Sequence, residues 1–154
     1  TKNDLGVYLG FNLFKKRVYG TETSSVNKKF YEDILNALND DINTSKALSL
    51  IDEMIGSAND KLDSNPKDKN LKKELIANIL FINEILGIGF NDAYEYFQFG
   101  INEDMKIKIE QLISKRNEAK KEKDFITADA VRDELSKMDI SLMDTSTGTV
   151  WEKL

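Results

Sequence analysis

Neither cysteine nor histidine occurs in the chain. Without cysteine there can be no disulfide bond and no thiolate metal site. Without histidine the chain lacks the most common general base and the most common metal ligand of proteins. Carboxylates, lysine and tyrosine remain as candidate catalytic groups. We nevertheless expect the chain by itself to be non-catalytic, and we assign it no catalytic and no metal-binding residue.

Proline and glycine are also scarce, with Pro66 as the single proline and eight glycines among 154 residues. This scarcity, together with abundant Lys, Glu, Asp, Leu and Ile, favours a mainly helical protein. No run of about eighteen apolar residues exists, so the sequence predicts no membrane span. The first residues show no secretory signal pattern, and the cytoplasm is the expected location.

Apolar residues recur at three- and four-residue steps through the first part of the chain and predict four helices. The predicted helices are residues 4–19, 30–39, 44–58 and 71–86. The predicted breaks are Gly20, the Asn39-Asp40-Asp41 run, a loop from Asn59 to Asn70, and Gly87. Asn43 or Thr44 can cap the third helix, because their side chains accept from free backbone N–H groups. Polar connections between four helices predict an antiparallel bundle.

A second region begins near Ile101 and combines helices with a short two-stranded element. One predicted helix ends near Lys121, and Asp124 can cap the next. Residues 140–142 alternate in polarity as a strand does, residues 144–148 have turn chemistry, and residues 149–151 can pair back. We therefore expect a mainly α chain, with a helical bundle at 1–100 and a small α+β domain at 101–154.

The charge of this second region changes sign along the chain. The whole sequence is acidic, with a net charge of −5, which does not favour non-specific binding to nucleic acid. From Lys106 to Lys123, however, basic residues outnumber acidic ones, and from Asp124 to Asp144 the acids dominate. A basic helix therefore runs into an acidic helix across a tight turn.

Two interpretations of this pattern remain open from the residues alone. The charges can be solvated faces joined by weak surface ion pairs. Alternatively, they can form an RNA site in which Lys and Arg meet phosphates and a few carboxylates meet base edges. An ionised carboxylate only accepts hydrogen bonds, so it suits the adjacent N1–H and N2–H donors of guanine or the amino group of cytosine.

Several motifs occur between roughly Phe30 and Trp151. They are Leu38-Asn39-Asp40-Asp41-Ile42-Asn43-Thr44, Leu86-Gly87-Ile88, Arg116-x-x-Ala119-Lys120-x-x-Lys123-Asp124-Phe125-x-x-Ala128-Asp129-x-Val131-Arg132-Asp133, and Asp144-Thr145-x-x-Gly148-Thr149-x-Trp151. In order and spacing they resemble the motifs of the cysteinyl-tRNA synthetase family. The resemblance implies a DALR-like helical bundle at 1–100, followed by an anticodon-binding domain at 101–154.

Members of this family are class I aminoacyl-tRNA synthetases, which activate cysteine with ATP and attach it to tRNA. Their catalysis lies in a Rossmann domain with a His-x-Gly-His-like motif, a Lys-Met-Ser-Lys-Ser loop and a zinc site of Cys, His and Glu. None of these motifs is present in this sequence. The resemblance thus implies that ATP, magnesium and zinc belong to the parent enzyme, expected to be monomeric, and that this chain alone is inactive.

The resemblance also implies which residues meet the anticodon stem-loop of tRNA-Cys. Asp129 and Asp144 match acids that contact anticodon bases, and Phe125 matches an aromatic position suited to base stacking. The cations expected in the site are Lys120, Arg116, Lys123 and Arg132. Lys120 stands where the family often has Arg; lysine lacks the planar, two-pronged donor, so a phosphate contact is expected there.

Ordinary structural roles remain as alternatives for each of these residues. Asp129 can be an exposed helix acid paired with Arg132 or Arg116, Asp144 can cap a turn, and Phe125 can be a core aromatic. Trp151 is expected mainly to pack in the core. At the level of function, the alternatives are a helical interaction module without RNA contact, or part of a related ligase that joins cysteine to a small sugar-amine thiol precursor.

Overall fold

The computed structural model describes residues 2–89 and 92–154, with side chains described from Leu9 onward. In this part of the chain there are seven helices and one two-stranded antiparallel sheet, so the predicted mainly α class with a short β element is confirmed. The chain forms two compact units, Thr1–Asn91 and Asp92–Leu154. None of the described helices is both long enough and apolar enough to cross a lipid bilayer.

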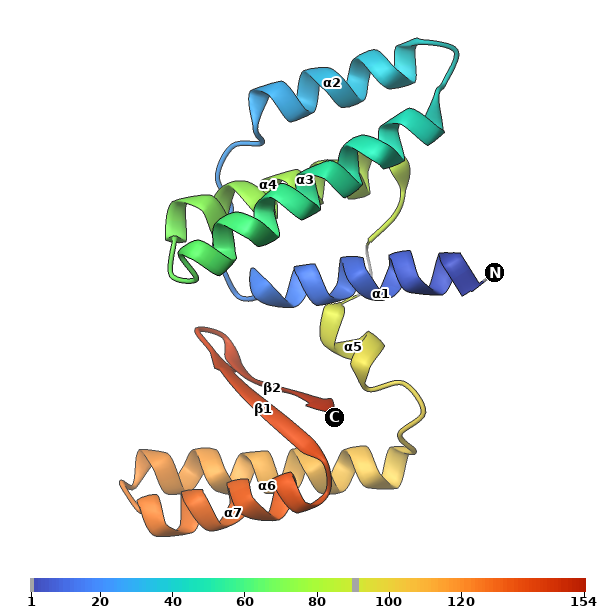
Figure 1. The fold of residues 1–154 in the computed structure, drawn as a ribbon. Helices are drawn as coiled ribbons and strands as arrows, with labels where there is room; N and C mark the ends of the chain where they lie inside the picture. Colours follow the sequence, from blue (N-terminus) through green and yellow to red (C-terminus); the bar gives the residue numbers. More distant parts are fainter. Residues whose placement is uncertain (1, 90–91) are drawn as a thin grey trace. The chain divides into compact units, whose positions relative to one another are not determined.

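The first unit is the predicted helical bundle (Figure 1). Its helices are α1 (Lys2–Arg17), α2 (Lys28–Asn39), α3 (Thr44–Ser64) and α4 (Lys69–Leu86). Two clusters of buried apolar side chains hold them together. One joins α1, α3 and α4 around Phe14 and Leu62, and the other joins α2, α3 and α4 around Ile34 and Ile82.

Local capping chemistry sets the ends of these helices. Asn27, Asn43 and Asp68 each accept a hydrogen bond from the backbone N–H three residues later, at 3.0, 3.0 and 2.9 Å. Asn43, one of the two predicted candidates, is thus the cap of the third helix. Gly87 ends α4 in the left-handed conformation, with φ of 65°, which a residue without a Cβ adopts without strain.

The predicted loop from Asn59 to Asn70 is wrong in its first half, because α3 continues to Ser64. The reason is the continuing apolar stripe. Leu62 follows Ala58 at a four-residue step, and both side chains are buried against α1 and α4. This burial outweighs the weak helix preference of the polar residues around Leu62.

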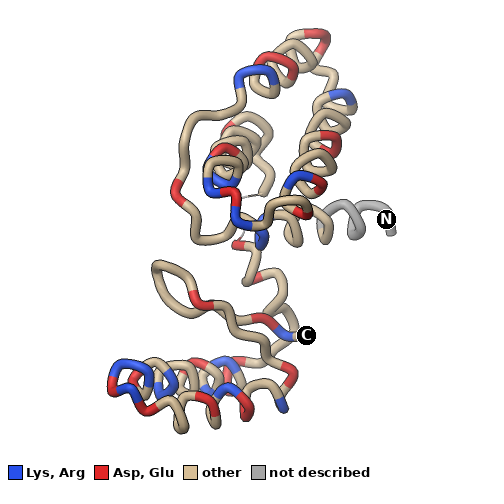
Figure 2. Tube along the Cα trace, turned by 60° about the vertical axis from the view of Figure 1, so that its left-hand side comes forward, with Lys and Arg blue, Asp and Glu red and all other residues tan. Residues whose placement is uncertain are grey.

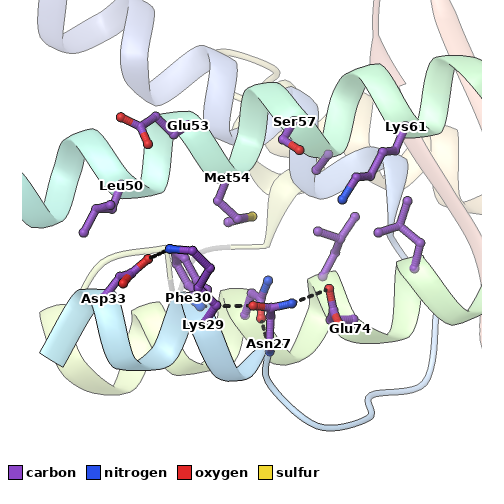
Figure 3. Close-up of a pocket in the computed structure, with 14 residues that line it drawn as sticks. Asn27, Lys29, Phe30, Asp33, Leu50, Glu53, Met54, Ser57, Lys61 and Glu74 are labelled. Atoms are coloured by element: carbon purple, nitrogen blue, oxygen red, sulfur yellow. Dashed lines mark hydrogen bonds and ion pairs between the residues drawn. The ribbon is translucent and has the colours of Figure 1, made fainter.

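A groove of about 300 Å³ runs between α2, α3 and α4. Figure 3 shows two interactions among its lining residues, an ion pair between Lys29 and Asp33 and a hydrogen bond from Asn27 to Glu74. Deeper in the bundle, the buried Asn78 accepts from the backbone N–H of Asn27 at 2.9 Å, which ties the start of α2 to α4. Five polar residues of this groove are therefore paired within the chain: Asn27, Lys29, Asp33, Glu74 and Asn78.

The close approach of Gly89 to α1 gives a test of the bundle's packing. Gly89 has φ of 83°, and a Cβ added there would lie 2.6 Å from the Phe11 ring. We expect Gly89→Ala to lower the free energy of unfolding of the bundle by about 1–3 kcal/mol. Gly56→Ala is the matched control, since it lies within α3 with open space around it, and it should stabilise by about 0.5–1 kcal/mol. Urea unfolding followed by circular dichroism measures both, and equal stability of the two variants would contradict this packing.

The second unit pairs a helical hairpin with the sheet. Its elements are α5 (Ala93–Phe97), α6 (Glu103–Lys121), α7 (Phe125–Lys137), β1 (Ile140–Thr145) and β2 (Gly148–Lys153). The strands are antiparallel, with Leu142 opposite Trp151. The second compact unit begins at Asp92 and therefore includes α5. The reason is that α5 contacts β2, where Gln98 donates to the backbone oxygen of Trp151 at 2.8 Å.

The core of this unit lies between α6, α7 and the sheet. It consists of Ile109, Ile113, Val131, Leu135, Ile140 and Trp151. Trp151 is only 2% exposed, and its indole N–H donates to Glu110 at 2.6 Å. Trp151 therefore belongs to the core, as expected from the sequence.

Candidate nucleic-acid interface

The turn between α6 and α7 brings the basic and acidic segments together as a helical hairpin. Lys123 occupies the turn in the left-handed conformation, with φ of 61°. Asp124 then caps α7, its carboxylate accepting from the backbone N–H of Thr127 at 3.1 Å. Hydrogen bonds from Thr127 hold the pKa of Asp124 below its usual value. The predicted cap is confirmed, and it fixes where Phe125 leaves the turn.

Asp144, on β1, is the centre of a cluster that joins the sheet to α6. Arg116 donates to both of its carboxylate oxygens, at 2.9 Å each. Lys120 donates to Oδ2 at 2.9 Å, and the Thr149 hydroxyl donates to Oδ1 at 2.8 Å. Each oxygen thus accepts two hydrogen bonds, and a carboxylate has about four acceptor positions in all. The acceptor capacity of Asp144 is filled from within the chain.

This cluster keeps Asp144 ionised. Hydrogen bonds from Arg116, and then from Lys120 and Thr149, hold the pKa of the Asp144 carboxyl well below its usual range, although partial burial opposes them. The same pairing raises the pKa of Arg116, whose side chain is 9% exposed. A guanidinium with so little access to water needs this partner, because a buried charge without one is costly.

For two residues of this cluster, the contacts in the structure differ from those expected from the sequence. Asp144 was expected to present an open acceptor to a base, but its acceptor positions are taken. Arg116 was expected as a cation for RNA, but it is buried and both of its Nη groups are engaged by Asp144. In this structure the pair is an internal brace between α6 and the sheet.

An exposed stripe on α7 carries three of the other predicted residues. Phe125, Asp129 and Arg132 follow at four- and three-residue steps, which places them on one face of the helix. All three are exposed, and Phe125 reaches 61% exposure, which excludes the core role that was its alternative. The Asp129 side chain makes no hydrogen bond or ion pair with other described residues, yet its charge acts on nearby Arg116. Its acceptor surface is therefore open to a ligand.

The lysines of the hairpin lie in the last turn of α6 and in the turn that precedes Phe125. Lys120 is half-exposed and held by Asp144, while Lys121 and Lys123 are exposed and make no ion pair with any residue in the described ranges. A shallow depression of about 410 Å³ lies between α6 and the sheet, lined by Lys120, Lys121, Asn117, Asp144, Thr145, Gly148 and Thr149. Figure 2 shows the mixed basic and acidic character of the hairpin.

Two residues of the cluster received no role from the sequence. Thr149 completes the shell of Asp144, and Asn117 lies 3.3 Å from the Thr149 hydroxyl. The Gly148-Thr149-x-Trp151 motif is the only sequence feature that points to Thr149. The motif alone does not show that Thr149 contacts Asp144. The two residues meet because the strand register places them opposite each other across the turn.

Two comparisons with known proteins bear on the family. Residues 33–91, in the helical bundle, match the family model of the DALR domain. A cysteine–tRNA ligase of Aliarcobacter butzleri is 83% identical over 140 residues, which is 91% of this chain. Cysteine–tRNA ligases of a Nitratiruptor species and of a Helicobacter pylori strain are 54% and 51% identical over the same share.

Over 91% of its length the chain matches cysteine–tRNA ligases, which confirms the resemblance predicted from its motifs. It spans 30% of the length of each of these relatives. Most of the length of such an enzyme therefore has no counterpart in this chain.

Proposed function

We propose that the chain is the C-terminal, tRNA-binding portion of a cysteine–tRNA ligase, and that the unit Asp92–Leu154 binds the anticodon stem-loop of tRNA-Cys. The observation that carries this proposal is the α7 stripe. It combines an exposed aromatic ring, Phe125, with an open carboxylate, Asp129, beside the exposed hairpin lysines. Proteins recognise single-stranded RNA by stacking aromatic side chains on bases, by hydrogen bonds to base edges and by contacts between cations and phosphates.

Within this proposal the two acids have different tasks. Asp129 accepts from the base-edge donors of the anticodon, guanine in particular, while Phe125 stacks on a neighbouring base. Asp144 positions Lys120, whose Nζ it fixes at 2.9 Å, and braces the sheet through Arg116. Lys120, Lys123 and Arg132 meet phosphates. This proposal keeps all the predicted residues in the site. Asp144 and Arg116, however, hold other residues in position and do not contact RNA themselves.

The proposal also covers the parent enzyme. Activation of cysteine with ATP and magnesium, together with the zinc site, belongs to the part of the enzyme that this chain does not span. Among the described residues of this chain, no group of three or more His, Cys, Asp and Glu side chains could hold a metal ion. A cytoplasmic location and a monomeric parent are part of the same proposal.

Substitution of Asp129 tests the anticodon-reading role. Asp129→Asn keeps the shape but replaces part of the acceptor surface with a donor. We expect it to lower the preference for the cognate stem-loop over an anticodon-swapped one by about tenfold, since a good base-edge pairing is worth roughly 1–3 kcal/mol. Affinity for the swapped stem-loop should not fall, because removing a negative charge reduces repulsion of phosphates. Titration by fluorescence anisotropy measures both affinities.

Glu134→Gln is the matched control for this experiment. It removes the same charge from the same helix, five residues further on and therefore on a different face, where Glu134 is exposed and has no side-chain partner among the described residues. It should leave the cognate-to-swapped ratio unchanged. A wild-type ratio in the folded Asp129→Asn variant would remove Asp129 from the reading residues. Failure of the wild-type chain to bind any stem-loop would instead favour a helical interaction module.

A further inference from the structure

Asn117 is an uncharged polar residue of α6 that takes no part in the RNA contacts proposed above. Its side chain is half-buried and lines the shallow depression between α6 and the sheet. The one hydrogen-bond contact of this side chain, among the residues described, is with Thr149, where Oδ1 lies 3.3 Å from the hydroxyl oxygen. One half of the Asn117 amide is therefore open to a ligand in the depression.

The single proton of the Thr149 hydroxyl decides which half of the amide is open. Asp144 is ionised, because its pKa is held well below the usual range, and an ionised carboxylate only accepts. The 2.8 Å contact between Thr149 and Asp144 Oδ1 therefore uses the hydroxyl proton. Thr149 has only lone pairs left for Asn117, so their contact is a hydrogen bond when the amide turns its Nδ2 towards the hydroxyl. The Oδ1 atom of Asn117 is then the open half, and it is an acceptor.

This oxygen lies near a free cation. Lys121 is four residues after Asn117 on α6, so the two side chains share one side of the helix. Both line the depression. Lys121 is exposed and makes no ion pair within the described part of the chain. The depression thus offers a neutral acceptor and a charged donor to the same ligand.

This combination suits the edge of a base better than a phosphate. A phosphate has only acceptor oxygens, so it would satisfy Lys121 but would face the Oδ1 atom of Asn117 without a proton between them. Adenine and cytosine each present an exocyclic amino donor beside a ring nitrogen that accepts. Guanine presents two adjacent donors, N1–H and N2–H, which suit the ionised Asp129 carboxylate better than a single amide oxygen. The acceptor of Asn117 and the donor of Lys121 therefore match adenine or cytosine.

We infer that Asn117 is a second base-reading residue, whose Oδ1 accepts from the exocyclic amino group of an anticodon adenine or cytosine while Lys121 donates to the neighbouring ring nitrogen. This inference rests on the proposed function, because it takes the anticodon stem-loop as the ligand. Asn117 supplies the acceptor that Asp144 cannot, since the acceptor positions of Asp144 are filled within the chain. Thr149 is the positioning residue that fixes the direction of the Asn117 amide.

Removal of single amino groups from the RNA tests this contact. Anticodon stem-loops are prepared in which each adenine is replaced by purine riboside, or each cytosine by its 4-deoxy analogue, so that only the amino group is lost. We expect one of these replacements to weaken binding to the wild-type chain by about tenfold, the scale of a base-edge contact. Asn117→Ala should bind the unmodified stem-loop about tenfold more weakly, and the same replacement should then change its affinity by less than about twofold. Fluorescence anisotropy measures each affinity.

Two further measurements separate base reading from other roles of Asn117. The residue is uncharged, so Asn117→Ala should keep the wild-type slope of log affinity against log salt, whereas loss of a phosphate-binding lysine would flatten it. Alanine favours a helix more than asparagine does, so the variant should stay folded in urea unfolding. Gln111→Ala is the matched control, since it removes an amide from an exposed position of α6 on a different side of the helix. It should bind every stem-loop as the wild-type chain does.

The inference is overturned if no adenine or cytosine amino group affects binding to the wild-type chain, a measurement that needs no variant. It is also overturned if Asn117→Ala remains as sensitive as wild type to the amino group that matters. In either case, a loss of cognate preference in Asp129→Asn still supports the proposed function. A wild-type chain that binds no stem-loop overturns both.

Discussion

Asp144→Asn should lower the free energy of unfolding of the C-terminal unit by about 2–3 kcal/mol at neutral pH. The substitution leaves the buried Arg116 guanidinium without a charged partner, and removal of one member of a buried pair costs about 3–5 kcal/mol. We expect somewhat less here because the Asp144 side chain is 43% exposed and water can replace part of the interaction. Urea unfolding followed by the fluorescence of Trp151, the only tryptophan of the chain, reports on this unit.

The effect should depend on pH in a defined direction. The pKa of Asp144 is lower in the folded chain than its unfolded value of about 3.9. Its contribution is therefore complete above pH of about 4 to 5, and it is lost as the pH falls towards the folded pKa. The wild-type chain should lose more stability than Asp144→Asn on acidification through this range. Asp133→Asn, at an exposed position of α7, should be within about 0.5 kcal/mol of wild type at neutral pH; a similar loss in both variants would show that Asp144 is an ordinary surface charge.

Leu135→Ala should have the largest effect of any substitution considered, about 3–5 kcal/mol. Leu135 is fully buried between α6, α7 and the sheet, and the smaller side chain leaves a cavity. A unit as small as Asp92–Leu154 has only about 3–5 kcal/mol of net stability. The variant should therefore be largely unfolded at physiological temperature, with Trp151 emission shifted to that of an exposed indole.

Ile126→Ala on the same helix is the control for this prediction. Ile126 is 86% exposed, so its truncation should change the free energy of unfolding by less than about 0.5 kcal/mol. Stem-loop binding should be lost in Leu135→Ala together with the Trp151 signal. A Leu135→Ala chain that melts like wild type would contradict the position of Leu135 in the core.

Most of the fold follows from local sequence signals. Asn43, Asp124 and Gly87 act on backbone groups within a few residues, so their capping roles can be predicted without knowledge of the tertiary structure. The end of α3 could not be placed in this way. The polar residues around Leu62 indicate a loop, and only the burial of Leu62 against other helices extends the helix to Ser64.

The residues of the candidate site could be predicted from the sequence, but the contacts between them could not. The family motifs contain Arg116, Asp129 and Asp144, and the structure brings them into one region. Arg116 and Asp144 are 28 residues apart, and no periodic pattern tells which carboxylate a buried guanidinium will meet. Sequence reasoning therefore gave the two aspartates the same task, whereas tertiary contacts occupy Asp144 and leave Asp129 open.

The pairing of Arg116 with Asp144 has a consequence for how the C-terminal unit can move. Arg116 lies on α6 and Asp144 on β1, with the whole of α7 between them in the chain. Separation of the sheet from α6 breaks both hydrogen bonds of the Arg116 guanidinium and leaves a buried charge without a partner, which is costly. The sheet and the helical hairpin should therefore open as one cooperative unit rather than one after the other.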